Sequence, residues 1–214
     1  MDLQVALDRI PLDRAVGITE AVAARTDWIE VGTSLVKQFG QDGLRRVVAA
    51  GAGTPVLADL KTVDDVVFEF EMAFAAGARS VTVLGLAPDV TIDRAVDVTG
   101  AHGRELVVDL MGLTQQRIEE LASRLPEHVR LAPHISKDAQ GDSASSGRRV
   151  QAMLGPWSSG RKLALAGGLK AEDLPALVDE PDLRVIVGSA VTKADDPVAA
   201  VEELRHAAGK DTTE

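Results

Sequence analysis

The sequence predicts an α/β fold, a (β/α)8 TIM barrel formed by one domain over residues 1–214. Three observations predict it. Eight short runs rich in Val, Ile and Leu recur along the chain, helical patterns separate them, and the first six runs begin about 25 residues apart. Strict alternation of strands and helices is typical of parallel strands joined by right-handed crossovers, and eight such units fill a chain of this length.

The predicted strands are short apolar runs, of the length expected for buried strands. They cover residues 3–8, 28–32, 56–60, 80–85, 105–112, 129–134, 162–168 and 184–189. A doubly wound open sheet is the alternative architecture. That fold usually carries a Gly-rich fingerprint after its first strand, whereas residues 8–11 (DRIP) occupy this turn here.

Helical patterns lie between the predicted strands. They cover residues 12–25, 35–50, 64–76, 89–99, 114–125, 172–178 and 197–208. Pro11 precedes the first pattern, and proline is favourable at a helix N-terminus. Gly51, Gly77 and Gly100 follow three of the others, and glycine in that place is the usual left-handed stop. We therefore expect helices to end at these glycines.

One irregular segment follows the sixth predicted strand. Residues 138–160 are expected to form a flexible loop, because residues 141–147 (GDSASSG) are small and polar. The loop leaves the carboxyl end of its strand, where barrels keep their active sites. It is either a tolerated surface insertion or a lid over substrate, and the lid is favoured. Residues 209–214 are expected to form a disordered tail.

Composition narrows the classes of partner. The net charge of −10 repels nucleic acid and anionic membranes, so neither is expected as a partner. Aromatic residues make up only 3% of the chain, which argues against base-stacking platforms. The chain has no cysteine, which excludes disulfides and thiolate nucleophiles and fits a reducing compartment. With no signal-peptide pattern and no long apolar run, we expect a soluble, cytoplasmic protein.

The segment of residues 59–64 (DLKTVD) carries the most chemical information. It places Asp59 and Lys61 at the end of a predicted buried strand, where charged groups need mutual pairing, a metal or a ligand. The two residues are two apart on an extended chain, so their side chains are predicted to point the same way. Asp64 lies where the next helix is expected to begin.

Polar residues also occupy the ends of other predicted strands. Asp8, Glu30, Asp109 and His134 lie at or near the ends of strands one, two, five and six. In a closed barrel these side chains and Asp59 converge on one pocket. Acidic residues are rarely buried without a partner, so four on one end of the strands indicate a functional site.

These side chains limit the chemistry of the pocket. Glu30 and Asp59 are hard oxygen ligands suited to Mg²⁺, or to Mn²⁺, with substrate oxygens and water completing the coordination. Lys61 can stabilise a developing oxyanion such as an enediolate. His134 can transfer protons near neutral pH.

Small residues end the last two predicted strands. Gly167 and Gly168 end the seventh, and Gly188 and Ser189 end the eighth. Glycines there let backbone N–H groups approach a phosphate, the usual place for that group on a barrel. The combined prediction is a sugar-phosphate enzyme that forms an enediolate with the help of a metal ion.

Structural roles are the alternative for each of these residues. Asp8 and Asp109 could only brace Lys61 in an ion pair at the barrel mouth. Glu30 could pair with Lys37 or with a neighbouring arginine. The strand-end glycines could serve as turns alone. A barrel that binds a sugar phosphate without catalysis would keep the glycines and lose the acid–base groups, which are present here.

With these residues in place, the sequence resembles the orotidine-monophosphate-decarboxylase superfamily over about residues 2–207. The D-x-K-x-x-D signature of that superfamily is present as Asp59, Lys61 and Asp64. It occurs together with the segments LQVALD, IEVGT, VDLMG, HISKDAQ and LAGGL. These companions narrow the resemblance to the branch that holds 3-hexulose-6-phosphate synthase and 3-keto-L-gulonate-6-phosphate decarboxylase. Orotidylate decarboxylase itself is metal-independent, and Glu30 argues against that activity.

The resemblance implies roles for individual residues. Residues matching Glu30 and Asp59 bind Mg²⁺ in this branch. The residue matching Lys61 supports the enediolate, and the one matching His134 handles a proton. The residue matching Asp64 is offered to the active site of the other subunit, which implies a homodimer.

Four positions separate the two activities of the branch. Asp109 and Ala166 match the synthase, and Ser189 lacks the guanidinium that the decarboxylase has there. Lys137 matches neither, since it keeps the charge of the decarboxylase arginine but not its planar fork. The resemblance therefore implies an aldehyde-lyase that condenses formaldehyde with D-ribulose 5-phosphate to D-arabino-3-hexulose 6-phosphate. The alternative is a carboxy-lyase, 3-keto-L-gulonate-6-phosphate decarboxylase or a related β-keto acid decarboxylase.

The helix after Asp64 independently predicts a subunit contact. One apolar stripe, which includes Phe70 and Phe74, can cover the barrel. A second stripe of Phe68, Met72 and Ala75 lies roughly opposite. An outer barrel helix needs only one such stripe for its own sheet, so the second is expected to contact another subunit. Cover by a neighbouring helix is the alternative.

Overall fold

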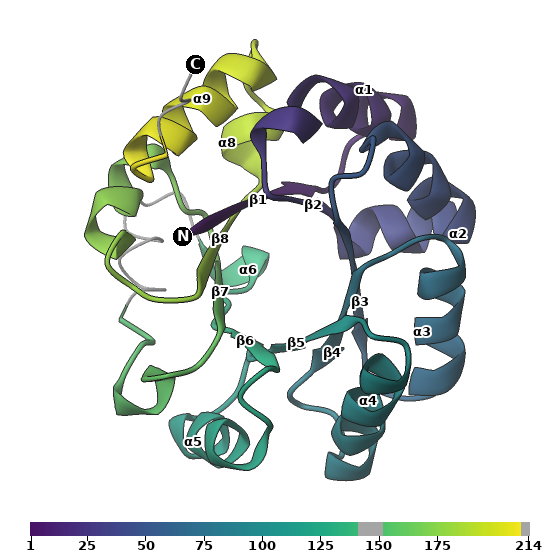
Figure 1. Ribbon diagram of the computed structural model, residues 1–214, viewed down its shortest axis with the longest axis vertical. Helices are drawn as coiled ribbons and strands as arrows, with labels where there is room; N and C mark the ends of the chain where they lie inside the picture. The colour runs from purple at the N-terminus through teal and green to yellow at the C-terminus, as the bar shows by residue number, and fades with distance from the viewer. Residues whose placement is uncertain (141–151, 211–214) are drawn as a thin grey trace.

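The computed structural model describes residues 1–140 and 152–210 and forms a closed barrel of eight parallel strands. Figure 1 shows the ring of strands surrounded by helices, so the predicted single-domain (β/α)8 TIM barrel is confirmed. Pairing of β1 with β8 closes the ring. The strands are β1 (Asp2–Leu7), β2 (Trp28–Val31), β3 (Val56–Thr62), β4 (Ser80–Leu84), β5 (Glu105–Asp109), β6 (Arg130–Ala132), β7 (Leu163–Ala166) and β8 (Leu183–Val187).

The helices alternate with these strands, and most of them pack on the outside of the ring (Figure 1). No helix within residues 1–140 and 152–210 is both long and apolar enough to cross a bilayer. The α-helices are α1 (Leu12–Val22), α2 (Thr33–Ala50), α3 (Val66–Ala75), α4 (Asp89–Ala101), α5 (Gln115–Arg124), α6 (Lys137–Gln140), α8 (Ser189–Thr192) and α9 (Pro197–Ala207). The 3₁₀ helices are η1 (Ala23–Arg25), η2 (Pro156–Ser158) and η3 (Ala171–Leu177).

The predicted helix stops are confirmed only in part. Gly77 follows α3 with φ of 101°, the left-handed conformation that glycine adopts without cost. Gly51 instead keeps a right-handed φ of −69°, and the left-handed residue after α2 is Ala52. The α4 helix likewise runs past Gly100, and Gly103 takes the positive φ. The α2 helix therefore ends at Ala50, as predicted, although its left-handed residue comes after Gly51, whereas α4 ends two residues later than predicted.

Two apolar regions hold the barrel together. The larger one fills the space between the strands and the surrounding helices. The smaller one lies inside the barrel and consists of Leu57, Val107, Ala132 and Ala164, with Trp28 and Ile186 packed against it. Side chains on alternate strand positions thus fill the middle of the ring, while polar side chains at its two ends remain available for other roles.

Part of the predicted loop and tail lies outside the described residues. The loop was expected over 138–160, and α6 forms its beginning while η2 lies near its end. Residues 141–151, which hold the segment predicted to form a lid, are outside the described part of the chain, as are residues 211–214. Of the predicted tail, Lys210 is described, and its ammonium lies 2.8 Å from a carboxylate oxygen of Asp27.

Candidate active site

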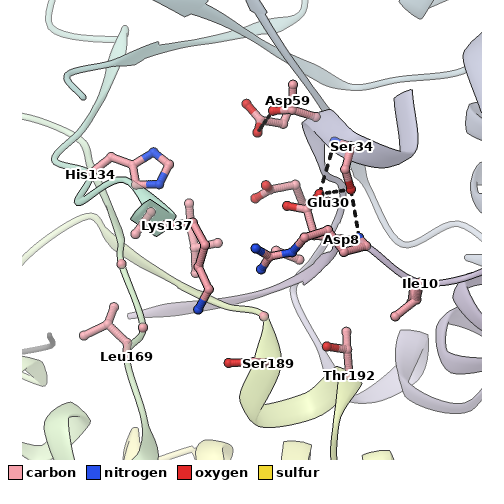
Figure 2. Close-up of a pocket in the computed structure, with 18 of the residues that line it drawn as sticks. Asp8, Ile10, Glu30, Ser34, Asp59, His134, Lys137, Leu169, Ser189 and Thr192 are labelled. Carbon is pink, nitrogen blue, oxygen red and sulfur yellow. Dashed lines mark hydrogen bonds between the residues drawn. The ribbon is translucent and has the colours of Figure 1, made fainter. Parts of the chain in front are cut away.

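A cavity of about 740 Å³ opens at the carboxyl ends of the strands. Figure 2 shows His134 and Lys137 on one side of it, with Asp8, Glu30 and Asp59 across from them. Most of the predicted site residues line this cavity: Asp8, Glu30, Asp59, Lys61, His134, Lys137, Ala166, Gly167, Gly168, Gly188 and Ser189. The strand order of the barrel therefore brings together residues from both halves of the chain.

A chain of charged groups forms the floor of the site. The Lys61 ammonium lies 2.9 Å from an oxygen of Asp59 and 2.7 Å from an oxygen of Asp109. The Nδ1 atom of His134 lies 2.9 Å from that same Asp109 oxygen. Asp109 does not line the cavity itself, but it holds the two residues that do. Its predicted contact with Lys61 is confirmed by this geometry.

Charge pairing sets the protonation of this chain. Burial opposes ionisation of Asp109, but the hydrogen bond with His134 and the charge of Lys61 lower its pKa to about 2. Burial also disfavours the charge of Lys61, yet the Asp59 and Asp109 carboxylates raise its pKa above the ordinary value. Lys61 is therefore a permanent cation. An ionised Asp109 can only accept, so Nδ1 of His134 carries a hydrogen and Nε2 holds the lone pair of the neutral ring.

The backbone around Lys61 departs from a regular strand. Lys61 has a left-handed φ of 49°, and the pairing of β3 with β4 shifts between Ala58 and Thr62. Lys61 and Asp59 do meet, as predicted, but through this irregularity rather than through simple alternation on an extended chain. A non-glycine residue with positive φ is unfavourable and is kept only where its surroundings fix it.

Thr82, on β4, provides that fixation and was missed by the sequence analysis. Its buried hydroxyl accepts a hydrogen bond from the Lys61 backbone N–H at 2.8 Å and donates to Asp59 Oδ1 at 2.9 Å. Thr33, the first residue of α2, donates to the other Asp59 oxygen at 2.6 Å. Asp59 is thus held on both oxygens. The available signal was polar residues at alternate positions of an otherwise apolar strand, Ser80 and Thr82.

Glu30 is buried beside Asp59 with little to balance its charge. Burial and the nearby Asp59 carboxylate raise the pKa of Glu30 to about 8. Its side chain accepts a hydrogen bond from the amide of Gln4. In the described part of the chain no ion pair joins Glu30 to Lys37 or to an arginine, so the predicted structural pairing is wrong.

Asp8 does not brace Lys61, contrary to one of the predicted alternatives. Its carboxylate accepts hydrogen bonds from the backbone N–H and the hydroxyl of Ser34 at the start of α2. The carboxylate fits there because residue 32 is glycine. A Cβ added to Gly32 would lie 2.4 Å from Cγ of Asp8. Asp8 therefore stands on the cavity wall, tied to α2 and separate from the Lys61 chain.

The other end of the cavity is lined by backbone and small side chains. Gly167 and Gly168 have φ of 140° and 80°, conformations that favour glycine, so these residues are more than spacers. Gly188 and Ser189 begin α8 beside them on the cavity wall. Figure 2 shows Ser189 at this end of the cavity, with Lys137 reaching toward it from the opposite wall. A small anionic group fits this end.

Asp64 is the predicted site residue that lies apart from the cavity. It is exposed in the connection between β3 and α3 and does not line the cavity. Its carboxylate accepts the backbone N–H of Asp65 at 2.8 Å. An exposed Asp64 on one chain is compatible with the prediction that it serves another subunit.

Glu30 and Asp59 are the two residues of the site that could hold a divalent cation. Both residues line the cavity close to the Lys61 ammonium, which pairs with Asp59. Burial and the neighbouring Asp59 carboxylate raise the pKa of Glu30, so a cation beside this pair would favour its charged form. Within residues 1–140 and 152–210, no three carboxylate or imidazole side chains form a complete metal cage. A cation held by Glu30 and Asp59 would therefore need further ligands from substrate or water.

Comparison with known proteins gives one consistent result. Residues 1–204 match the model of a family described as orotidine 5′-phosphate decarboxylase / HUMPS. The chain is 36% identical to the 3-hexulose-6-phosphate synthase of Mycobacterium gastri over 210 residues, covering 97% of this chain and 99% of that protein.

Solved structures agree with this result. The crystal structure of 3-hexulose-6-phosphate synthase from Salmonella typhimurium superposes with a TM-score of 0.88 at 30% identity, covering 99% of this chain and 100% of that one. The 3-keto-L-gulonate-6-phosphate decarboxylase of Vibrio cholerae is more distant. It has a TM-score of 0.77 at 25% identity, with 99% of each chain covered.

Proposed function

The chain belongs to the orotidine 5′-phosphate decarboxylase / HUMPS family and is a carbon–carbon lyase, and from this premise we propose that it condenses formaldehyde with D-ribulose 5-phosphate. The product is D-arabino-3-hexulose 6-phosphate. One observation carries the proposal. A partly buried ammonium, that of Lys61, lies between Asp59 and Asp109, with His134 on the same Asp109 and Glu30 across the cavity.

Removal of a proton from C1 of the ketose is assigned to His134. Its Nδ1 is held by the ionised Asp109, which leaves Nε2 as the basic atom. The electron pair left on carbon becomes the enediolate. Lys61 stabilises the negative charge that develops on oxygen, because its paired ammonium is already in place before the reaction.

The bond-forming step balances with these groups alone. The C1 carbon of the enediolate attacks the formaldehyde carbon, and a new C–C bond forms as the C=O double bond of formaldehyde opens. The resulting alkoxide takes back the proton that His134 holds. No oxidant or reductant is needed. The proton removed at the start is returned at the end, which fits a single histidine serving as base and then as acid.

Glu30 and Asp59 are proposed to hold Mg²⁺, with Mn²⁺ as a possible substitute. The bound ion would supply Lewis acidity to the substrate oxygens and offset the charge of these two carboxylates. The raised pKa of Glu30 supports this role, since burial beside Asp59 disfavours its charge unless a cation is present. Thr33 and Thr82 orient Asp59 for this purpose.

The phosphate of the substrate is assigned to the glycine-lined end of the cavity. Backbone N–H groups near Gly167, Gly168, Gly188 and Ser189 can approach phosphate oxygens closely, because no bulky side chain intervenes. Ala166 leaves additional space on the same wall, and Lys137 provides positive charge. The substrate would then lie across the cavity with its reacting carbons near His134 and Lys61.

Product analysis tests the reaction. The purified protein with Mg²⁺ is incubated with D-ribulose 5-phosphate and formaldehyde, and separately with 3-keto-L-gulonate 6-phosphate. We expect formaldehyde to be consumed in step with the pentulose phosphate and a chelator to stop the reaction. Release of CO₂ from the second substrate, without formaldehyde consumption, would instead assign the decarboxylase activity. No turnover of either substrate would contradict the proposed function.

We propose further that the protein is a homodimer whose subunits share Asp64. Phe68 on α3 is 66% exposed, so no helix in the described part of the chain covers this residue of the second apolar stripe. Other large apolar side chains lie exposed on the segments from 63 to 90: Val63, Val67, Leu86 and Val90. Such a patch favours a subunit contact, and Asp64 lies beside it in the sequence.

Mixed dimers test the sharing of Asp64. Asp64→Asn and Lys61→Ala variants should each be inactive, because each lacks one part of every site. Mixing them after subunit exchange should restore about a quarter of wild-type activity, since half of the dimers are mixed and each holds one intact site. Absence of recovery, with mixed dimers shown to form, would contradict a shared site.

A further inference from the structure

A second charged cluster lies at the amino-terminal end of the barrel interior. Two oxygens of Glu105 on β5 accept hydrogen bonds from Arg184 on β8, at 2.9 and 3.1 Å, and Arg130 on β6 lies 3.2 Å from one of them. Arg184 is only 1% exposed. Its guanidinium also lies over the ring of Trp28, with 3.8 Å between the guanidinium carbon and the ring centroid. Arg184 is therefore fixed in place.

Gln4 on β1 connects this cluster to the cavity at the other end. It is completely buried. Its carbonyl oxygen accepts a hydrogen bond from Arg184 at 3.2 Å, and its side-chain nitrogen donates to Glu30 Oε2 at 2.5 Å. One amide thus joins a buried guanidinium to the carboxylate that lines the cavity. The catalytic chemistry proposed above makes no direct use of Gln4.

The orientation of the Gln4 amide is dictated by its neighbour. A guanidinium has donors and no acceptor, so Arg184 requires the oxygen of the amide. The NH₂ group must then face the opposite side, where Glu30 lies. A carboxylate accepts this hydrogen bond readily, and the bond holds Oε2 of Glu30 toward Gln4 in the barrel interior. The remaining oxygen of Glu30 is left for the cavity.

From these contacts we propose that Gln4 is a positioning residue for Glu30, with its amide orientation set by Arg184. The link to Mg²⁺ rests on the proposed function, because Glu30 is a metal ligand only in that proposal. The positioning itself does not depend on the ion. Hydrogen-bond partners that orient a ligand commonly change metal affinity by 10–100-fold when they are removed.

The first test replaces Gln4 with methionine, which keeps the length of the side chain and removes both hydrogen bonds. A crystal structure of Gln4→Met should show the Glu30 carboxylate turned from its wild-type position. Mg²⁺ titration by calorimetry should show affinity lowered at least tenfold. Thr99→Val is the matched control, because it removes one buried hydroxyl bond on α4, far from the cavity, and should leave affinity unchanged.

The second test asks whether Arg184 acts through Gln4. Arg184→Met should weaken Mg²⁺ binding in the wild-type background and have little further effect in the Gln4→Met background, because residues acting in series are not additive. Equal losses in both backgrounds would overturn the role assigned to Arg184. If Arg184→Met fails to fold, the position of Glu30 in the Gln4→Met structure still tests whether Gln4 positions Glu30.

The outcomes separate this inference from the proposed function. An unchanged Glu30 position in Gln4→Met overturns the positioning role of Gln4. If the wild-type protein binds no divalent ion but Glu30 moves in Gln4→Met, the metal site fails and the positioning role stands. Thermal unfolding of each variant shows whether the variant is still folded under the conditions of the Mg²⁺ titration. A lower Mg²⁺ affinity in a variant that is fully folded cannot be explained by loss of stability.

Discussion

The two ends of the barrel interior each hold a cluster of buried charges, and they are balanced in opposite ways. At the amino-terminal end, Glu105 is surrounded by Arg130 and Arg184, and these guanidinium groups lower its pKa despite burial. At the carboxyl end, Glu30 lies beside Asp59, and burial with this second carboxylate raises its pKa to about 8. The same residue type in the same barrel thus has opposite electrostatic surroundings.

Buried charges that are fully paired stabilise the fold, whereas buried charges of one sign beside a cavity indicate a functional site. In the amino-terminal cluster each carboxylate oxygen of Glu105 accepts from a guanidinium, and Arg130 also donates to the carbonyls of Leu163 and Asp182 at 2.8 Å each. This cluster stabilises the fold. At the carboxyl-terminal end, the carboxyl groups of Glu30 and Asp59 lie close together beside a cavity, and such a pair favours the binding of a cation. The candidate site therefore differs from the amino-terminal cluster in the pairing of its buried charges, and less in their burial.

The largest expected effect comes from removing the ammonium at the carboxyl end. Lys61→Met should lower kcat for the condensation by about 10²–10³-fold, because the developing oxyanion loses its preorganised cation. Steady-state assays with D-ribulose 5-phosphate and formaldehyde measure this, and circular dichroism checks that the variant is folded. Activity above a tenth of the wild-type value would contradict the role of Lys61.

A smaller effect, of a different kind, is expected at the amino-terminal end. Arg130→Met removes one partner of a buried ion pair and the hydrogen bonds that this guanidinium donates to two carbonyls. The free energy of unfolding should fall by about 3–5 kcal/mol, as measured by urea denaturation. The kcat and KM of the folded protein should not change. A loss of activity without loss of stability would remove the distinction between the two ends.

A still smaller effect is expected from pH, through the protonation of Glu30 at the carboxyl end. Glu30, with a pKa of about 8, must lose a proton before it binds Mg²⁺ as a carboxylate. Affinity should therefore rise with pH, by about tenfold from pH 7 to well above pH 8, with release of a proton on binding. Calorimetric titrations in buffers of different ionisation enthalpy measure both. Glu30→Gln should bind weakly at every pH, and a wild-type affinity that falls as pH rises would contradict this assignment.

Much of the fold could be predicted, because apolar periodicity is a local property of the chain. All eight strands were placed, and α3, α5 and α9 begin within two residues of their predicted starts. Helix ends were less predictable. Ala52 takes a left-handed turn that glycine placement assigned to Gly51, because local packing decides which residue bears the strained conformation.

The candidate site was predictable to the extent that it depends on strand ends. Charged residues at the carboxyl ends of parallel strands must meet once the barrel closes, so Glu30, Asp59 and His134 could be predicted to lie in one site. Gln4 and Thr82 could not be singled out, because a polar residue inside a strand acquires its role from the strand beside it. Their partners lie 26 and 23 residues away, on other strands.

The amino-acid order alone determined that this chain alternates strand and helix and that its charges gather at strand ends, since both follow from side-chain period and local composition. Only the closed barrel decided which charges are neighbours. It gave Glu105 two guanidinium partners and set Glu30 against Asp59. Electrostatic energy depends on distance through the folded interior, and sequence separation does not specify that distance.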